Sequence, residues 1–200
     1  MASQPAARSS FLAGMGETTI IGIDPSSKKI AWVEASVEGW RYGEQVLPVK
    51  LTDKYTSYNA YAALEYMEHI FSTVLDPGST DVYLEAPVLA GRGKANPQSM
   101  LPQAFVSGVI QAAAMRAGIR KVTMVAPSAW KKTVVGNGSA QKPQVGRNLR
   151  SRWPDLHRKV VLSGDLKDAG SICIYGCHQG GFRPLMADLG KVQRRRRNPR

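Results

Sequence analysis

The pattern of apolar and polar positions predicts three β-strands in the first quarter of the chain. Residues 18–24, TTIIGID, form a β-branched run that stops at an Asp-Pro pair. Residues 28–36 alternate after the short turn that follows, and residues 40–50 contain a third plausible strand. We therefore expect an antiparallel meander at the start of the fold.

The middle of the chain is predicted to alternate helices with strands. Residues 55–75 carry apolar side chains three or four positions apart, which is typical of an amphipathic helix whose apolar face comprises Tyr61, Leu64, Met67, Ile70, Phe71 and Val74. Residues 80–87 form a short strand that stops at a proline. Residues 100–118 are rich in alanine and apolar on most sides, which predicts a buried helix.

The remaining segments complete an α/β pattern. We expect a strand at residues 121–127, the start of a helix at 128–135, a loop at 136–143, a basic helix at 144–153 and a last helix at 165–180. The resulting order, β-β-β-α-β-α-β-α-α, indicates one mixed sheet with helices on its faces. In such sheets, functional sites gather at strand ends and at the helix starts beside them.

Length and composition predict one globular domain with loose ends. The 200 residues are 43% hydrophobic, which is enough for one core and hardly enough for two. We expect a flexible leader at residues 1–17, the domain at 18–180 and a basic tail at 181–200. No apolar run approaches the ~20 residues that span a bilayer, so we expect a cytoplasmic protein. The acid-free start, MASQPAARSS, leaves organelle targeting as an alternative.

The positive charge is concentrated in two segments. The chain has a formal net charge of +12, yet residues 120–160 alone carry +9 and the last ten residues add +6. The other 149 residues have a net charge of −3. Such clustering is expected of a protein that binds a polyanion, although the arginine run of the tail would also serve as a solubility tail.

Four acids are placed where chemistry is expected. Asp24 and Glu85 end predicted strands, while Asp165 and Asp168 open the last helix, about 60° apart on one face. Taken singly, these acids also suit a turn, an exposed strand end or a helix cap. Taken together, they would repel one another unless they held divalent cations. Two bound Mg²⁺ ions suit the hydrolysis of a phosphodiester.

Four segments resemble a known family when taken in order. The segments IIGIDPSSKKIAWV, VYLEAP, KKTVVGNGSAQKPQV and DLKDAGSICI are similar to those of the RuvC Holliday junction resolvases, members of the ribonuclease H-like superfamily. The similarity runs from about residue 18 to residue 180. It implies a ribonuclease H-like, five-stranded mixed sheet flanked by helices. It also implies a homodimer with two active sites that resolves four-way DNA junctions by paired nicks.

The resemblance also implies roles for individual residues. It assigns metal binding and catalysis to Asp24, Glu85, Asp165 and Asp168, with two Mg²⁺ per active site and Mn²⁺ as a substitute. Lys131 and Lys142 match family lysines that contact DNA near the scissile strand, and the basic segment around them adds Lys132, Arg147 and Arg150. Where the family usually has an aromatic residue after the strand-end glutamate, this chain has Val88. That difference and the basic tail indicate a relaxed, phage-like member.

Other features favour structural roles. Cys173 and Cys177 are interpreted as two small buried residues, and Trp130 and Trp153 as core residues more than as base-stacking ones. Two alternatives to a junction resolvase are a ribonuclease H-like nuclease acting on flaps, forks or hybrid duplexes, and a non-catalytic junction-binding protein. The presence of all four acids argues against the non-catalytic alternative.

Overall fold

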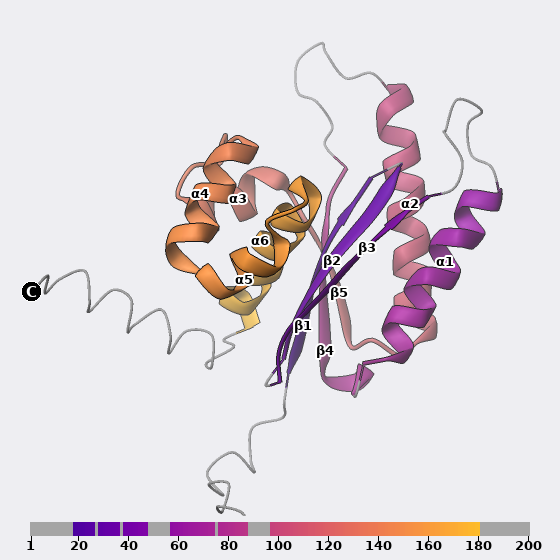
Figure 1. Cartoon of the computed structure of the whole chain (residues 1–200). Helices are drawn as coiled ribbons and strands as arrows, with labels where there is room; N and C mark the ends of the chain where they lie inside the picture. Colours follow the sequence, from indigo (N-terminus) through magenta and orange to yellow (C-terminus); the bar gives the residue numbers. More distant parts are fainter. Residues whose placement is uncertain are drawn as a thin grey trace, which may run out of the picture.

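A computed structural model describes residues 18–26, 28–36, 38–47, 57–74, 76–87 and 97–180. The leader, Val88 and the basic tail lie outside the described residues. In Figure 1 a central sheet separates two groups of helices. The fold therefore has three layers, with a helical layer on each face of the sheet.

The sheet has five strands in the order β3-β2-β1-β4-β5. Its strands are β1 (Thr19–Pro25), β2 (Lys29–Ser36), β3 (Gly39–Val46), β4 (Thr80–Glu85) and β5 (Lys121–Val125). Antiparallel pairing of β1 with β2 and of β2 with β3 confirms the expected meander. Parallel pairing of β4 with both β1 and β5 makes the sheet mixed, as expected. The C-terminal ends of β1 and β4 therefore lie side by side at the same end of the sheet, an edge that runs across the strand ends.

The helices divide between the two faces of the sheet (Figure 1). One face is covered by α1 (Ser57–Ser72) and α2 (Pro97–Arg116), and a short 3₁₀ helix, η2 (Pro77–Ser79), leads into β4. The other face is covered by α3 (Pro127–Val135), α4 (Lys142–Arg152), α5 (Pro154–Val160) and α6 (Gly164–Gly180). None of the helices in the described part of the chain is long and apolar enough to cross a membrane.

The region after β5 is more helical than the sequence pattern predicts. Four helices follow β5 up to residue 180, where the described part of the chain ends, because Pro154 starts a separate helix, α5, directly after Trp153. A proline suits the first turn of a helix, where its missing N–H would have no partner. Lys142 belongs to the first turn of α4 and not to the expected loop. The Gln141 backbone N–H donates to Gln144 Oε1 at 2.8 Å, which stabilises this start.

Two expectations about burial are wrong. Tyr61, assigned to the apolar face of α1, is 68% exposed, and Ala63 is buried on that helix instead. α2 is not buried on most sides, since Leu101 and Met115 are 54% and 77% exposed. The physical reason is that α2 packs against the sheet and α1 through one side only, which includes Val106 and Ile110.

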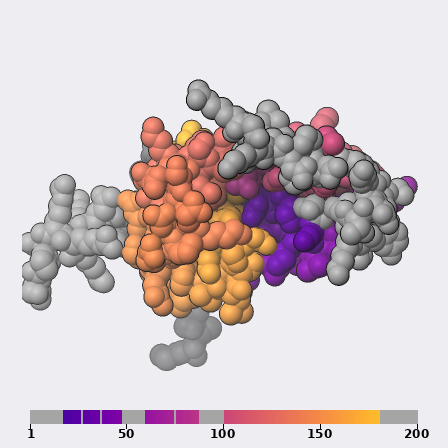
Figure 2. Space-filling model, turned by 90° about the horizontal axis from the view of Figure 1, so that it is seen from above, coloured from indigo at the N-terminus to yellow at the C-terminus, as the bar shows by residue number. Residues whose placement is uncertain are grey.

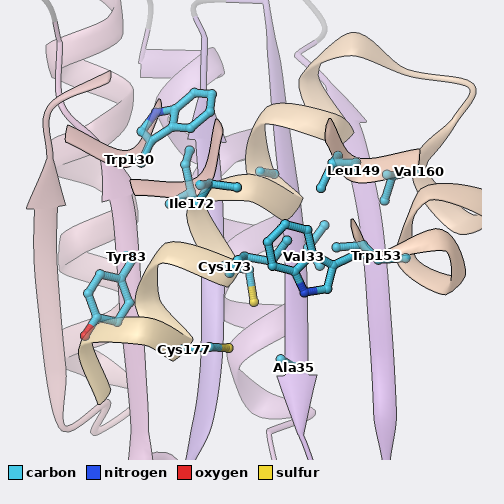
Figure 3. Close-up of a cluster of buried hydrophobic side chains, with 14 of the residues drawn as sticks. Val33, Ala35, Tyr83, Trp130, Leu149, Trp153, Val160, Ile172, Cys173 and Cys177 are labelled. Carbon is cyan, nitrogen blue, oxygen red and sulfur yellow. The ribbon is translucent and has the colours of Figure 1, made fainter. Parts of the chain in front are cut away.

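α6 packs directly on β1 through glycine. A Cβ added to Gly22 would lie 2.2 Å from the Cys173 backbone nitrogen and 2.5 Å from the Ala169 carbonyl oxygen. On α6, a Cβ added to Gly176 would lie 2.4 Å from the Tyr83 ring. Figure 3 shows Tyr83 and Cys173 within the same apolar layer. The helix backbone therefore rests against the sheet with no side chain between them at Gly22.

The two cysteines are buried and free, which confirms their interpretation as core residues. The Cys173 thiol lies 3.4 Å from the Ile20 carbonyl oxygen, and burial raises the pKa of this thiol well above its ordinary range. The thiols therefore behave as small apolar groups of the layer between α6 and the sheet.

Gly22→Ala tests the close packing of α6 on β1. We expect it to lower the free energy of unfolding by about 3 kcal/mol, because a clash with backbone atoms is not relieved by a change of rotamer. Gly108→Ala is the control, since a Cβ at this exposed position of α2 meets no atom of the described residues within 4 Å. The free energy of unfolding of this control should rise by about 1 kcal/mol, because alanine has a higher helix propensity than glycine. Equal urea-unfolding curves for Gly22→Ala and the wild type would contradict the packing.

Candidate active site

Asp24 and Glu85 lie side by side at the ends of β1 and β4. The parallel register pairs Ile23 with Leu84, so the next residues along the two strands are Asp24 and Glu85. Two residues earlier on the same strands, Gly22 and Tyr83 contact α6. Because alternate residues of a strand share a face, both carboxylates lie on the face that α6 covers.

The first turn of α6 brings two more carboxylates to this edge. Asp165 and Asp168 lie close enough to Asp24 that the charge of each raises the pKa of Asp24. Burial is the larger cause, and together with the neighbouring Glu85 it raises the pKa of Asp24 well above its ordinary range. All four acids that the sequence singled out therefore belong to one electrostatically coupled group, which we call the acidic cluster.

Asp168 is the most buried member of the acidic cluster, with 8% of its surface exposed. Burial raises its pKa to about 6, and the negative charges of Glu85 and Asp165 act in the same direction. The positive charges of Lys142 and Lys131 oppose this rise. The folded protein therefore holds a proton on Asp168 more tightly than an unfolded chain would.

Two lysines partly neutralise the acidic cluster. Lys142 Nζ lies 2.9 Å from Asp165 Oδ1 and 3.6 Å from Asp168 Oδ2. Its hydrogen bond to Asp165 raises the pKa of Lys142, so the ammonium stays charged. Lys29 Nζ lies 3.8 Å from Asp165 Oδ2 and 3.2 Å from Glu44 Oε1. A cationic group thus already lies between the two acids of α6.

The donor atoms of the acidic cluster fit a hard divalent cation. Asp168 Oδ1 is buried and accepts no hydrogen bond from any described residue, which is costly unless a positive partner contacts it. Carboxylate oxygens are the ligands that Mg²⁺ prefers. Within the described ranges, no three His, Cys, Asp or Glu side chains form a ready-made ligand set. Some rearrangement of the carboxylates, with displacement of Lys142 from between Asp165 and Asp168, would have to accompany cation binding.

Trp130 contributes a contact that sequence reasoning missed. Its side chain is fully buried in α3, which confirms its interpretation as a core residue. Its indole Nε1 donates a hydrogen bond to Glu85 Oε1 at 2.9 Å. Lys131 Nζ lies 5.3 Å from the centre of the Trp130 ring. The position of Trp130 beside Lys131 was visible in the sequence, but nothing there linked it to Glu85.

Two further contacts at this edge also carry no sequence signal. Lys29 is the first residue of β2, and the short turn before it brings its side chain toward α6. Gln103, on α2, donates from Nε2 to the Pro25 carbonyl oxygen at 3.1 Å. That bond ties the second helical layer to the residue that follows Asp24. Both contacts depend on tertiary packing, so local patterns do not reveal them.

The five expected DNA-binding residues divide into two groups. Lys131 and Lys142 act electrostatically on the acidic cluster. Lys132, Arg147 and Arg150 are exposed and form no ion pair with another described residue. Seen from the end of the sheet where β1 and β4 finish, atoms of the first strands reach the surface beside those of α4 to α6 (Figure 2). The basic helices thus border the edge that carries the acids.

Solved structures of known proteins share this fold. The chain matches a Thermus thermophilus RuvC structure with a TM-score of 0.58 at 17% identity, over 82% of this chain and 97% of that one. It matches T. thermophilus RuvC in complex with Holliday junction substrate with a TM-score of 0.55 at 18% identity, over 78% and 90% of the two chains. This likeness and the strand order place the chain in the ribonuclease H-like fold class, a mixed five-stranded sheet flanked by helices.

Sequence comparison narrows this class to a family. The family model for crossover junction endodeoxyribonuclease RuvC matches residues 20–174. The RuvC protein of Bacteroides fragilis is 32% identical over 173 residues, covering 85% of this chain and 87% of the relative. That of Sphingopyxis alaskensis is 32% identical over 164 residues, covering 80% and 95%. The chain therefore belongs to the RuvC family of crossover junction endodeoxyribonucleases and is an enzyme of that kind.

The raised pKa of Asp168 predicts a pH-dependent loss of stability without divalent cations. The protonated Asp168 carboxyl contributes fully to the free energy of unfolding below about pH 4. This contribution is lost as the pH rises through about 6, because the folded state then gives up a tightly held proton. The shift corresponds to about 3 kcal/mol at most. In EDTA, the free energy of unfolding of Asp168→Asn should lack this fall with rising pH, so the variant should be more stable than the wild type at pH 7.

Urea unfolding between pH 4 and pH 8 measures the effect. Asp155→Asn is the matched control, because Asp155 is exposed on α5 and its ion-pair partner is Arg158, which is not a member of the acidic cluster. Its stability should follow that of the wild type within about 0.5 kcal/mol. Parallel stability curves for Asp168→Asn and the wild type would show that burial of Asp168 has no cost.

Proposed function

We propose that this enzyme is a Mg²⁺-dependent endonuclease that resolves four-way DNA junctions, as a homodimer, by paired nicks. The observation that carries the proposal is the acidic cluster, with lysines beside it and with Asp168 Oδ1 buried inside it without a hydrogen-bond partner among the described residues. Membership of the RuvC family supports the junction as substrate. Because the substrate is DNA, we place its action in the cytoplasm of a bacterial or phage-infected cell.

Each part of the acidic cluster has a role in this proposal. Bound divalent cations would activate water and stabilise the leaving oxygen of a phosphodiester. Asp24 and Glu85, fixed by the sheet, would hold these cations together with Asp165 and Asp168 of α6. The rigid sheet and the close packing of α6 keep the carboxylates in place. Hydrolysis would proceed by direct attack of water, with no covalent bond to the enzyme.

The lysines would hold the DNA backbone. Lys142 Nζ now contacts two carboxylates, and this side chain is exposed enough to turn toward a phosphate instead. Lys131 lies at the same edge, and Lys132, Arg147 and Arg150 provide exposed positive charge around it. The solved T. thermophilus relative is described in complex with a Holliday junction substrate, which supports the same ligand for this fold. Phosphate contacts of this kind position the DNA without reading its sequence.

A cleavage assay tests the proposed function. Labelled four-way junction, flap and linear duplex are incubated with the protein in Mg²⁺ or in EDTA. We expect symmetric, Mg²⁺-dependent nicks in the junction. Asp168→Asn should lower the cleavage rate by more than about 100-fold while junction binding is retained. Loss of a residue that binds the metal directly should cost more than loss of a residue that only contacts a metal ligand.

The other outcomes identify the alternatives. Preferred cutting of the flap would indicate a ribonuclease H-like nuclease with another substrate. Junction binding without any nick would indicate a non-catalytic binding protein. Cleavage that persists in Asp168→Asn would remove this residue from the catalytic set.

Lys142→Ala tests the proposed phosphate contact. Loss of one contact should lower the dependence of junction binding on salt by about one unit of the logarithmic slope and should slow cleavage. Lys121→Ala is the matched control, because Lys121 is exposed at the start of β5, at the opposite end of the sheet. Binding is measured over a range of salt concentrations. If both variants show the same slope and the same cleavage rate, Lys142 has no such role.

A further inference from the structure

The indole of Trp130 is directed at one catalytic carboxylate. Trp130 is fully buried in α3, and its single donor, Nε1, lies 2.9 Å from Glu85 Oε1. A buried N–H group without an acceptor costs free energy, and a carboxylate acceptor gives a stronger bond than a neutral one. Here the acceptor belongs to the acidic cluster. The bond therefore links the core of the α3 to α6 layer directly to the site.

Glu85 needs such a restraint. Its carboxylate lies beside Asp24 and is close enough to Asp168 to raise the pKa of both. A protonated Asp24 hydrogen-bonds to Glu85, but when both neighbours are ionised, as ligands of a cation would be, their repulsion favours rotation of Glu85 away from them. The terminal torsion of a glutamate is soft, so packing alone does not fix the plane of the carboxylate. A hydrogen bond to Oε1 restricts this plane from the side opposite to solvent.

A second tryptophan shows that packing in this layer does not itself require an acceptor. Trp153 belongs to the same apolar cluster and is also buried. Figure 3 shows both indoles in this layer. Nε1 of Trp153 has no hydrogen-bond partner among the described residues. The bond from Trp130 to Glu85 is therefore a specific contact of the site.

We propose that Trp130 is a positioning residue, which holds the Glu85 carboxylate in the orientation that binds the catalytic cation. The same ring lies under Lys131, whose Nζ is 5.3 Å from the ring centre. Trp130 thereby also sets the distance between a DNA-contacting lysine and the metal-binding glutamate. This proposal rests on the proposed function of the acidic cluster and adds a residue to it.

Trp130→Phe removes the N–H group and keeps an aromatic ring. Binding of Mn²⁺ to the protein without DNA is followed by the loss of the free-ion EPR signal, and cleavage of a four-way junction is measured against Mg²⁺ concentration. We expect both half-saturating concentrations to rise about 10- to 100-fold, with a smaller change in the rate at saturating Mg²⁺. Trp153→Phe is the control, because it removes from the same layer an indole N–H that has no acceptor among the described residues. It should leave both half-saturating concentrations unchanged.

A second variant separates positioning from folding. Replacement of Trp130 by β-(3-benzothienyl)alanine keeps the two-ring shape and lacks only the N–H group, so it should weaken Mn²⁺ binding with unchanged thermal unfolding. If either Trp130 variant, once folded, binds Mn²⁺ as Trp153→Phe does, the proposal is overturned while the proposed function stands. If the wild type binds Mn²⁺ but cuts no junction, the proposed function fails, and the binding comparison still decides the role of Trp130.

Discussion

The close approach of α6 to β1 is the constraint on which the site depends. Gly22 lets the helix backbone contact the strand, and Gly176 does the same against Tyr83 further along the helix. With two glycines at the interface, the helix has little room to shift along the sheet. Its first turn is thereby held above the ends of β1 and β4. Asp165 and Asp168 consequently face Asp24 and Glu85, although about 80 residues separate Glu85 from Asp165 in sequence.

The same packing creates an electrostatic cost. Carboxylates that are both buried and close together resist ionisation, which the raised pKa values of Asp24 and Asp168 express. Lys142 offsets part of this cost by lying between Asp165 and Asp168. Stability given up at a functional site in this way is common among enzymes. In the proposed function, bound cations would relieve this repulsion and would leave Lys142 free to contact DNA.

The strands and the acids were predictable because each depends on local pattern. A β-branched run ending in Asp24-Pro25 indicates a strand end whatever the rest of the chain does. Glu85 ends its own strand in the same way, and the spacing of Asp165 and Asp168 sets them on one face of a helix. The parallel pairing of β1 with β4 then brings these acids together. The resemblance to the RuvC family independently indicates the same four residues.

What local pattern could not show depends on contacts between distant elements. The bond from Trp130 to Glu85 requires α3 to pack across the end of β4, which no periodicity reveals. Tyr61 fits the apolar repeat of α1, yet it projects to solvent because the helix rests on the sheet through a narrower face. The short helix α5 was missed because seven residues are too few to show a helical repeat.

Anomalous X-ray scattering tests most directly whether the acidic cluster binds metal ions. Crystals of the protein are soaked in Mn²⁺, and diffraction is recorded above the manganese absorption edge. We expect an anomalous peak bounded by Asp24, Glu85 and Asp168, with Lys142 Nζ displaced from between Asp165 and Asp168. A cluster that stays bridged by Lys142, with no peak beside it at saturating Mn²⁺, would contradict this expectation.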